Sequence, residues 1–587
     1  MQKDQWSSLV AMFFDQADAK GDRPFLWGKN EGVYQPVTWR AAAEEVRRMA
    51  GALVSAGLNP GDRVMLVSEN SPRWAMADLA IMAAGGITVP VYTTNTARDH
   101  LHILTDSGAA MAFVSTPALA GPFLEAALQV PAFRLMVAMS PMNEAAPASV
   151  AVSAWEGMLA EGEGAVSLPA LRPTDTACII YTSGTGGAPK GVVLSHKAIF
   201  ANCLGAHHLL LELGLDDEVF LSFLPLSHSY EHTCGLMFPI SIGAEIYYAE
   251  GVETLSGDML LAKPTIMTAV PRLYEVMRQK ILVGLRRAGG LKRGMFEQAV
   301  ALGRKAYEDP ASLTLSEKAR NAVLERLVRD KVRARFGGRL KALVSGGAPL
   351  NPEVGLFFTA LGMRLLQGYG QTEAAPVVSC NPPSGIRIHT VGPPLKDVEV
   401  RIADDGEILV RGDLLMTGYW NDPEASSIAL ADGWLHTGDI GVIDPDGYLE
   451  ITDRKKDIIV NSGGDNISPQ RVEAMLTLEP EIGQAMVFGD RRPHLVALIV
   501  PDESLVTRFV NGQPVSLANL CDDPAFREAV KAAVDRANAN LSVIERVKRF
   551  AIADEPFTTA NAQMTPTLKI RRHEILKRYR DTLEDLY

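Results

Sequence analysis

The sequence is poor in cysteine, and neither a signal peptide nor a membrane-spanning run is expected from it. Its cysteines are odd in number and widely spaced, without a C-x-x-C pair: Cys178, Cys203, Cys234, Cys380 and Cys521. A disulfide framework or a zinc site is therefore not indicated, and a reducing, cytoplasmic compartment is predicted. The N-terminus carries acidic residues where a signal peptide would be basic and then apolar. The longest apolar run, 79–92, is interrupted by Pro90 and too short for a bilayer, so any membrane contact would be peripheral.

Positive charge is also scarce, because 57 Lys and Arg residues stand against 69 Asp and Glu residues, for a net charge of −12. Such a chain would repel a phosphate backbone, so no nucleic-acid partner is expected. Local basic clusters at 286–287, 454–456 and 571–572 are candidate contacts for anions or lipid headgroups. The composition is that of an ordinary globular protein, and 587 residues exceed what one core can fill, so two or more domains are expected.

Three predicted strands run directly into loops of small residues. They lie in "TACIIYTSGTG", "LKALVSGGAP" and "MRLLQGYGQTE". After the second loop, Asn351 is a predicted N-cap and Pro352 the first helical residue. Open α/β sheets bind ligands at the carboxyl ends of their strands, so these loops predict one crevice in a layered α/β domain.

The rest of the chain changes character twice. Residues 278–336 are densely charged with helical spacing, which predicts a helical insertion. Turn sequences at 404–406 and 444–447 then predict hairpins in a β-rich subdomain of about 390–453. A polar, glycine-rich stretch follows, and a helix is expected near Ser468. We therefore predict an N-terminal domain of 1–453 and a small α+β domain of 454–587.

The loop "YTSGTGGAPKG" (181–191) has the composition of an anion cradle, with backbone amides, hydroxyls and Lys190 close together. It fits neither the Walker A loop, because Gly191 follows the lysine, nor G-x-G-x-x-G, because Pro189 replaces the third glycine. A flexible surface turn explains an isolated stretch of this kind equally well. Its position directly after a buried strand favours phosphate binding.

Three further segments contain candidate site residues. In "QGYGQTE", Tyr369 can stack on a base and Glu373 can hold Mg²⁺. In "DGWLHTGDIG", Asp439 can accept hydrogen bonds from ribose hydroxyls, and "PTLKIRR" contains Lys569 near the C-terminus. Each alone has an ordinary explanation: a surface acid, a turn aspartate and a solvated lysine.

In their order along the chain, these segments resemble the motif series of the AMP-forming acyl- and aryl-adenylating enzymes. The resemblance runs from about 38 to 572 and includes a D-R-x-x-D segment at 453–457. Within that superfamily, "LPLSHSYEH" (224–232), "AVPRLYEVM" (269–277) and the helical insertion resemble the long-chain fatty acyl-CoA synthetases, and "DGWLHTGDIG" also matches them closely.

The resemblance implies an adenylate-forming enzyme fold with a mobile C-terminal domain and a reaction in two halves. ATP and a long-chain fatty acid give acyl-AMP and pyrophosphate, and coenzyme A then takes the acyl group. Mg²⁺ is the implied metal. The resemblance leaves chain-length preference, a homodimer and membrane association open.

It also implies the roles of individual residues. The catalytic set is Lys569, Glu373, Thr372 and His228, where His228 lies beside the acyl pocket and Thr372 contacts the α-phosphate. Thr185 and Glu373 would serve Mg²⁺, and Lys456 would be the hinge. The resemblance does not decide whether Tyr230 or His232 gates the fatty-acid tunnel. The nucleotide and coenzyme A contacts would be Thr182, Ser183, Gly184, Thr185, Gly186, Lys190, Gly346, Gly347, Ala348, Gln367, Gly368, Tyr369, Gly370, Asp439, Arg454, Lys456, Gly463 and Gly464.

Three other classes of protein share parts of this pattern. A fatty acyl-AMP ligase makes the same adenylate and passes it to a carrier protein, and medium-chain and aryl-CoA ligases share the adenylation motifs. A catalytically inactive nucleotide- or lipid-binding module is disfavoured, because Lys190, Glu373, Asp439, Arg454 and Lys569 are all retained. The loop spacing excludes a P-loop ATPase.

Overall fold

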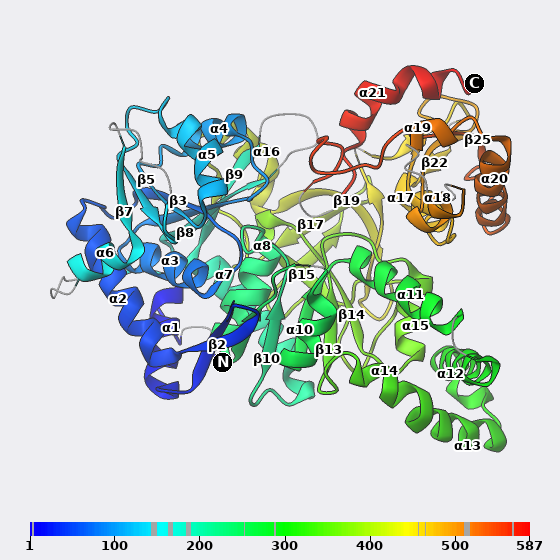
Figure 1. Cartoon of the computed structure of the whole chain (residues 1–587), viewed down its shortest axis with the longest axis horizontal. Coiled ribbons are helices and arrows are strands. Elements are labelled where there is room, and N and C mark those ends of the chain that lie inside the picture. The colour runs from blue at the N-terminus through cyan, green and yellow to red at the C-terminus, as the bar shows by residue number, and fades with distance from the viewer. Residues whose placement is uncertain are drawn as a thin grey trace.

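The computed structural model describes residues 1–587 except 3–4, 143–149, 163–167, 183–188, 252, 287–288, 456, 464, 510–516 and 566–568. The described strands form five sheets, two of them eight-stranded, and helices pack between and around the sheets (Figure 1). The chain is therefore a mixed α/β protein, as the sequence predicts.

One eight-stranded sheet carries two of the three predicted glycine-loop strands, β13 and β14. Its interior strands pair in parallel, while β1–β2 and β14–β15 pair antiparallel at the two ends. In order across the sheet, the strands are β15 (Val377–Cys380), β14 (Leu365–Gly370), β13 (Ala342–Ser345), β12 (Ile266–Ala269), β10 (Val219–Ser222), β11 (Glu245–Tyr248), β1 (Pro24–Asn30) and β2 (Val33–Thr38).

The second eight-stranded sheet contains β8, the strand that precedes the "YTSGTGGAPKG" loop. The expected crevice therefore draws on two sheets, a division that no local sequence signal indicates. Across this sheet the strands are β18 (Gly418–Tyr419), β9 (Lys190–Ser195), β8 (Thr176–Thr182), β4 (Ile87–Val91), β3 (Arg63–Val67), β5 (Met111–Val114), β6 (Leu135–Ala138) and β7 (Ala151–Ala154).

A single hydrophobic cluster joins the two large sheets through helices. It includes residues of α1 (Leu9–Lys20), α2 (Trp39–Ser55), α3 (Pro72–Ala83) and α7 (His196–Leu210) together with strands of both sheets. Helices α4 (Ala97–Ser107) and α5 (Pro117–Ala127) cover the other face of the second sheet. The shorter helices of this region are α6 (Trp155–Glu161), α8 (Ser229–Glu231), α9 (Phe238–Ser241) and α10 (Leu255–Ala262).

The charged segment after β12 forms the predicted helical insertion, which extends outward at the lower right of Figure 1. A second hydrophobic cluster joins the insertion to β12, β13 and α15. Helix α15 begins at Pro352 behind the N-cap Asn351, as expected. The helices are α11 (Pro271–Arg286), α12 (Gly290–Glu308), α13 (Leu315–Leu324), α14 (Asp330–Ala334) and α15 (Pro352–Ala360).

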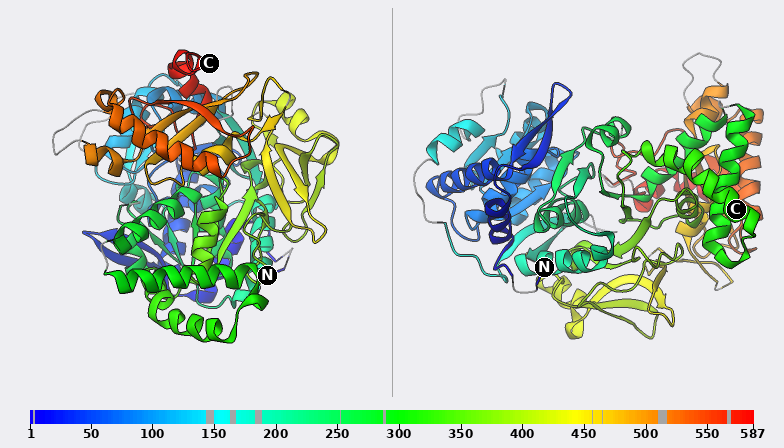
Figure 2. Two further views of the ribbon diagram at one scale, coloured as in Figure 1. Left: turned by 90° about the vertical axis from the view of Figure 1, so that its right-hand side faces the viewer. Right: turned by 90° about the horizontal axis from the view of Figure 1, so that it is seen from below.

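A four-stranded antiparallel sheet forms the predicted β-rich subdomain, and it projects at the bottom of the right-hand view of Figure 2. Both expected hairpins are present, since β16 turns into β17 and β19 into β20. The elements are β16 (Glu399–Ile402), β17 (Glu407–Arg411), α16 (Pro423–Ala429), β19 (Leu435–Ile443) and β20 (Leu449–Arg454).

After Arg454 the chain builds two small sheets and two hydrophobic clusters of its own. Helix α17 starts at Pro469 behind the N-cap Ser468, where the sequence predicts a helix. The elements are β21 (Ile459–Val460), β22 (Asn466–Ile467), α17 (Pro469–Leu476), β23 (Ile482–Phe488), β24 (Leu495–Pro501), α18 (Glu503–Phe509), α19 (Leu517–Leu520), α20 (Pro524–Ala539), β25 (Val547–Ile552) and α21 (Arg572–Glu584).

The described helices include none with both the length and the apolar character to cross a bilayer. All five cysteines are free, four of them buried.

Candidate active site

Lys190 begins β9, and the structure places its ammonium between an acid and an aromatic ring. Its Nζ lies 2.9 Å from Asp422 Oδ2 and 5.3 Å from the centre of the Tyr419 ring. Thr182 ends β8 and faces Lys190 across the antiparallel pair. The predicted phosphate contacts Ser183, Gly184, Thr185 and Gly186 lie outside the described residues.

Thr372 and Glu373 follow β14 in a short 3₁₀ turn. Glu373 Oε1 accepts a 2.8 Å hydrogen bond from the Tyr419 hydroxyl. The hydroxyls of Thr372 and Ser229 lie 2.9 Å apart in a buried contact. Tyr419 therefore touches both Glu373 and Lys190, and brings together the ends of strands from the two large sheets.

The glycine loop after β13 packs against an aromatic ring. A Cβ on Gly346 would lie 2.9 Å from the ring of Tyr230, so only glycine allows this approach. Tyr230 is held in place because its hydroxyl donates to the Val344 carbonyl at 3.0 Å. Gly347 adopts a positive φ of 81°, and Ala348 follows it.

Next to this loop, Gln367, Gly368, Tyr369 and Gly370 form the end of β14. A Cβ on Gly370 would fall 1.9 Å from the Pro376 carbonyl oxygen, which accounts for glycine beside the neighbouring strand β15.

Tyr369, Asp439 and Arg454 form a hydrogen-bonded row. The Tyr369 hydroxyl donates to Asp439 Oδ2 at 2.7 Å, and Arg454 Nε donates to Asp439 Oδ1 at 2.9 Å. Burial, reinforced by the Asp439 charge, raises the pKa of Tyr369 well above its usual value. Burial alone would lower the pKa of Arg454, but the Asp439 carboxylate reverses the direction and raises it. The carboxylate is thus fixed between two donors.

Lys569 reaches this row from the C-terminal part of the chain. Its side chain is exposed at the surface. Partial desolvation of the amine by the neighbouring protein lowers its pKa to about 8. The positive charge of Arg454 acts in the same direction, while the Asp439 carboxylate opposes it. The backbone is held locally, since Lys569 N donates to Thr565 Oγ1 at 3.1 Å.

The charge of Lys569 also affects the pKa of His228. Burial and, next, the Lys569 charge lower the pKa of His228 to about 3. Its Nδ1 accepts a 3.1 Å hydrogen bond from Tyr230 N, so the neutral ring carries its proton on Nε2. His232 is different: it is fully buried, and its Nε2 lies 2.9 Å from Asp78 Oδ2.

The residues expected at the hinge and the coenzyme A channel are only partly described. Lys456 and Gly464 lie outside the described residues. Gly463 is exposed, and its N–H donates to Asn461 Oδ1 at 2.9 Å. Their roles stay predictions.

Sequence reasoning missed three residues that contact the expected site: Ser229, Tyr419 and Asp422. Ser229 lies inside the "LPLSHSYEH" segment and could have been found from that segment. Tyr419 and Asp422 belong to the turn "GYWNDPE", which follows the phosphate loop by more than two hundred residues. No local signal pairs them with Lys190 and Glu373.

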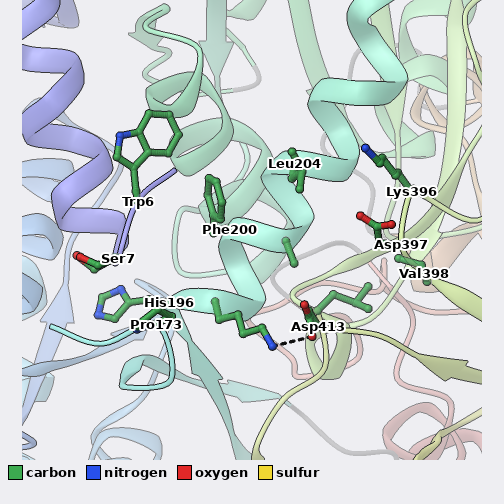
Figure 3. A pocket seen from close by; sticks show the side chains of 14 residues that line it. Trp6, Ser7, Pro173, His196, Phe200, Leu204, Lys396, Asp397, Val398 and Asp413 are labelled. Carbon is green, nitrogen blue, oxygen red and sulfur yellow. Dashed lines mark ion pairs between the residues drawn. The ribbon is translucent and has the colours of Figure 1, made fainter. Parts of the chain in front are cut away.

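A separate pocket lies between the N-terminal segment, α7 and the chain around 396–414 (Figure 3). It encloses about 80 Å³, and its lining is mainly apolar, including Trp6, Phe200 and Leu204. Lys197 and Asp413 form a 2.7 Å ion pair within it. Its lining contains none of the predicted site residues.

Residues 13–420 match the AMP-binding enzyme family, and residues 456–587 match the AMP-binding enzyme C-terminal domain. The chain belongs to the AMP-binding enzyme family. The resemblance inferred from the ordered motifs is therefore confirmed at the level of the family, over most of the chain.

Two curated relatives are similar to the chain over most of its length. The long-chain-fatty-acid–CoA ligase FadD15 of Mycobacterium tuberculosis is 35% identical over 589 residues, covering 99% of this chain and 97% of the relative. The peroxisomal long chain acyl-CoA synthetase 7 of Arabidopsis thaliana is 31% identical over 584 residues, covering 95% and 82% respectively.

Solved structures of other proteins share the fold. The adenylation domain of a carboxylate reductase from Mycobacterium chelonae aligns with a TM-score of 0.77 at 22% identity, covering 100% of this chain and 92% of that one. The anthranilate CoA ligase AuaEII, solved with anthranoyl-AMP, aligns with a TM-score of 0.72 at 20% identity, covering 99% of each. The predicted adenylate-forming fold is thus confirmed.

Proposed function

We propose that the protein is an AMP-forming long-chain fatty acid–CoA ligase. It converts a fatty acid and ATP to acyl-AMP and pyrophosphate, and then transfers the acyl group to coenzyme A. The observation that carries the adenylation chemistry is the convergence of Lys569 with Arg454, Asp439 and His228. The choice of a long-chain acid and of coenzyme A is supported by the relatives of matching length that bear those names.

In the first half-reaction a carboxylate oxygen attacks the α-phosphorus, and the bond to the departing pyrophosphate breaks. An anion approaches a polyanion, so the protein must position both and neutralise their charge. Lys190 would leave Asp422 to hold the terminal phosphates, and the Thr372 hydroxyl would donate at the α-phosphate. Asp439 accepts from the ribose hydroxyls while Arg454 holds that carboxylate in place.

Lys569 and His228 would act at the reacting carboxylate. The Lys569 ammonium would bridge the acyl carboxylate and the ribose-side oxygen of the nucleotide, where negative charge gathers in the transition state. His228 is neutral at physiological pH and carries its proton on Nε2, so it can donate there without adding charge. In the second half-reaction the thiol attacks the acyl carbonyl and AMP leaves with its bonding pair.

The residues present fit a magnesium ion bound partly through the substrate. Mg²⁺ is held by one or two carboxylates together with phosphate oxygens, and Glu373 is such a carboxylate at the end of β14. No group of three His, Cys, Asp or Glu side chains gathers as a metal site within the described part of the chain. When bound, the ion would neutralise phosphate charge; Glu373 and Thr185 would be its protein ligands.

The same proposal extends to the organisation of the protein. Residues 1–453 would form the adenylation domain, and residues 454–587 a domain that rotates about Lys456 between the half-reactions so that Gly463 and Gly464 face the thiol. We place the enzyme in the cytoplasm with peripheral membrane contact, and a homodimer is one assembly open to it.

The test is a pyrophosphate-release assay across a fatty-acid chain-length series, with and without coenzyme A. Long-chain acids should give the highest kcat/KM, and acyl-CoA should accumulate only when coenzyme A is present. Each buried methylene adds about 0.8 kcal/mol, roughly fourfold, until the tunnel is filled. Persistent acyl-AMP without acyl-CoA would identify a fatty acyl-AMP ligase instead, and a maximum at medium-chain or aromatic acids would reject the long-chain assignment.

A further inference from the structure

The helical insertion concentrates positive charge in an otherwise acidic protein. Residues 271–339 contain seventeen Lys and Arg residues against seven Asp and Glu residues, whereas the whole chain has a net charge of −12. Within the insertion, α13, a π-helical turn (Glu325–Arg329) and α14 form continuous helical backbone from 315 to 334. This helix lies at the outer edge of the molecule, at the lower right of Figure 1 and the bottom of the left-hand view of Figure 2.

The two faces of this helix differ in what they contact. Leu324 and Val328 point inward and are buried in the cluster that joins the insertion to β12 and α15. On the outer side, Leu315 is 86% exposed, Val323 56% and Leu327 45%. Val323 and Leu327 are four residues apart and therefore neighbours on one helical face. These two side chains are not part of the hydrophobic core.

The acidic side chains on this helix all form ion pairs with Lys or Arg residues of the insertion itself. Glu317 pairs with Lys305 at 2.9 Å, and Arg333 pairs with Glu325 and Asp330, each at 2.6 Å. Five exposed cations remain for which the described part of the chain provides no side-chain hydrogen bond or ion pair: Lys318, Arg320, Arg326, Lys331 and Arg335. The outer face is therefore positively charged without compensation.

We propose that this basic-aliphatic face, formed by Leu315, Lys318, Arg320, Val323, Arg326, Leu327, Lys331 and Arg335, docks on an anionic lipid bilayer. An interfacial helix needs cations for the headgroups beside aliphatic side chains for the acyl boundary, and side chains of both kinds are exposed to solvent along this helix. Lys and Arg can extend toward the headgroups while their stems lie along the apolar layer. Exposed aliphatic groups have no use against nucleic acid, and the remaining chain would repel it.

Charge complementarity also sets the orientation. The insertion would face the acidic membrane, and the rest of the protein, which carries the excess of Asp and Glu, would face away. The proposal rests on the peripheral membrane contact proposed above and assigns it to a surface that shares no residue with the candidate active site. It would place an enzyme for amphiphilic acids where such acids partition.

Vesicle co-sedimentation of the full-length protein tests the proposal. The probes are phosphatidylcholine vesicles with 30 mol% phosphatidylglycerol and vesicles of phosphatidylcholine alone, each in low salt and in about 0.5 M salt, where screening is strong. We expect binding to the anionic vesicles in low salt only. Equal binding to both vesicles, or none to the anionic ones, would overturn the proposal.

A matched pair of triple variants locates the surface. Arg320→Gln, Arg326→Gln and Lys331→Gln together should lower partitioning by roughly a hundredfold, at about fivefold per cation near an anionic surface. The control, Arg508→Gln, Arg527→Gln and Lys531→Gln, removes the same charge from exposed positions of α18 and α20 and should bind like wild type. Similar losses in both variants would show a general charge effect and refute this assignment.

The aliphatic contribution is tested separately by Val323→Ser with Leu327→Ser. This variant should bind anionic vesicles several-fold more weakly at unchanged salt dependence, because its charges are intact. An unchanged affinity would contradict insertion into the bilayer. Variant-sensitive binding to duplex DNA with no vesicle binding would reassign the face and overturn the lipid proposal. Circular dichroism and pyrophosphate release with octanoate confirm that every variant is folded.

Discussion

At the scale of single residues, a substitution of Glu373 tests its proposed role as a Mg²⁺ ligand. It accepts a hydrogen bond from Tyr419, which leaves carboxylate lone pairs for a cation. Glu373→Gln keeps the shape but removes the charge, so the Mg²⁺ concentration for half-maximal pyrophosphate release should rise about tenfold or more. Tyr419→Phe is the control, because it removes the hydroxyl and leaves the carboxylate. A Mg²⁺ response unchanged in Glu373→Gln would remove this residue from the metal site.

Lys569 should give the adenylation half-reaction a characteristic pH dependence. Its pKa is lowered to about 8 by desolvation, so the required cation is present below that pH and is lost as the pH rises through it. We expect kcat/KM for pyrophosphate release to fall about tenfold per pH unit above pH 8, since it reports ionisations of the free enzyme.

The matching variant is Lys569→Arg. Arginine stays protonated throughout this range, so the variant should be slower but should lose the decline above pH 8. A decline at the same pH in Lys569→Arg would assign the ionisation to another group. His228 should not contribute, because its pKa of about 3 keeps it neutral across the assay.

At the scale of elements, the loop after β13 depends on close packing between glycine and tyrosine. A Cβ on Gly346 would meet the Tyr230 ring, so Gly346→Ala should cost about 1–3 kcal/mol of unfolding free energy and raise the KM for ATP. Urea unfolding and adenylation kinetics measure the two effects. Gly257→Ala in α10 is the control, because outside its chain neighbours and its own helix no described atom lies within 4 Å of its added methyl, so this variant should gain up to about 1 kcal/mol from helix propensity. Equal stability of the two variants would show that the loop yields without strain.

Elements with strong local signals could be predicted from the sequence. Asn351 caps its helix as expected, a helix begins next to Ser468 as expected, and the turns at 404–406 and 444–447 form hairpins. The sequence does not predict that β8 lies in a different sheet from β13 and β14. The neighbours of a strand in a parallel sheet depend on packing between segments that are distant in the sequence. Motif order identified the family without this information.

The same limit applies to contacts inside the site. Tyr369, Asp439 and Arg454 are each singled out by their motifs, but that they form one hydrogen-bonded row is visible only in the structure. Tyr419 and Asp422 lie in a turn that carries none of the recognised motifs. Their contacts with Glu373 and Lys190 depend on how β18 pairs with β9.

At the scale of the whole molecule, the candidate active site combines residues from the middle of the chain with Lys569 near the C-terminus. Asn351 Nδ2 donates to the Ala474 carbonyl at 3.0 Å, and Leu478 packs against the cluster of the helical insertion. These contacts accompany a state in which Lys569 lies near His228 and Asp439. In the proposed mechanism, Lys569 acts in the first half-reaction and the C-terminal domain takes a different position for the second.

Separate assay of the two half-reactions in Lys569→Ala tests this account most directly. Pyrophosphate release from ATP and palmitate should fall by about 100-fold or more, which is roughly 2.7 kcal/mol of lost transition-state stabilisation. Formation of palmitoyl-CoA from supplied palmitoyl-AMP and coenzyme A should stay within a few-fold of wild type. Equal loss of both half-reactions, or no loss of the first, would contradict the role assigned to Lys569.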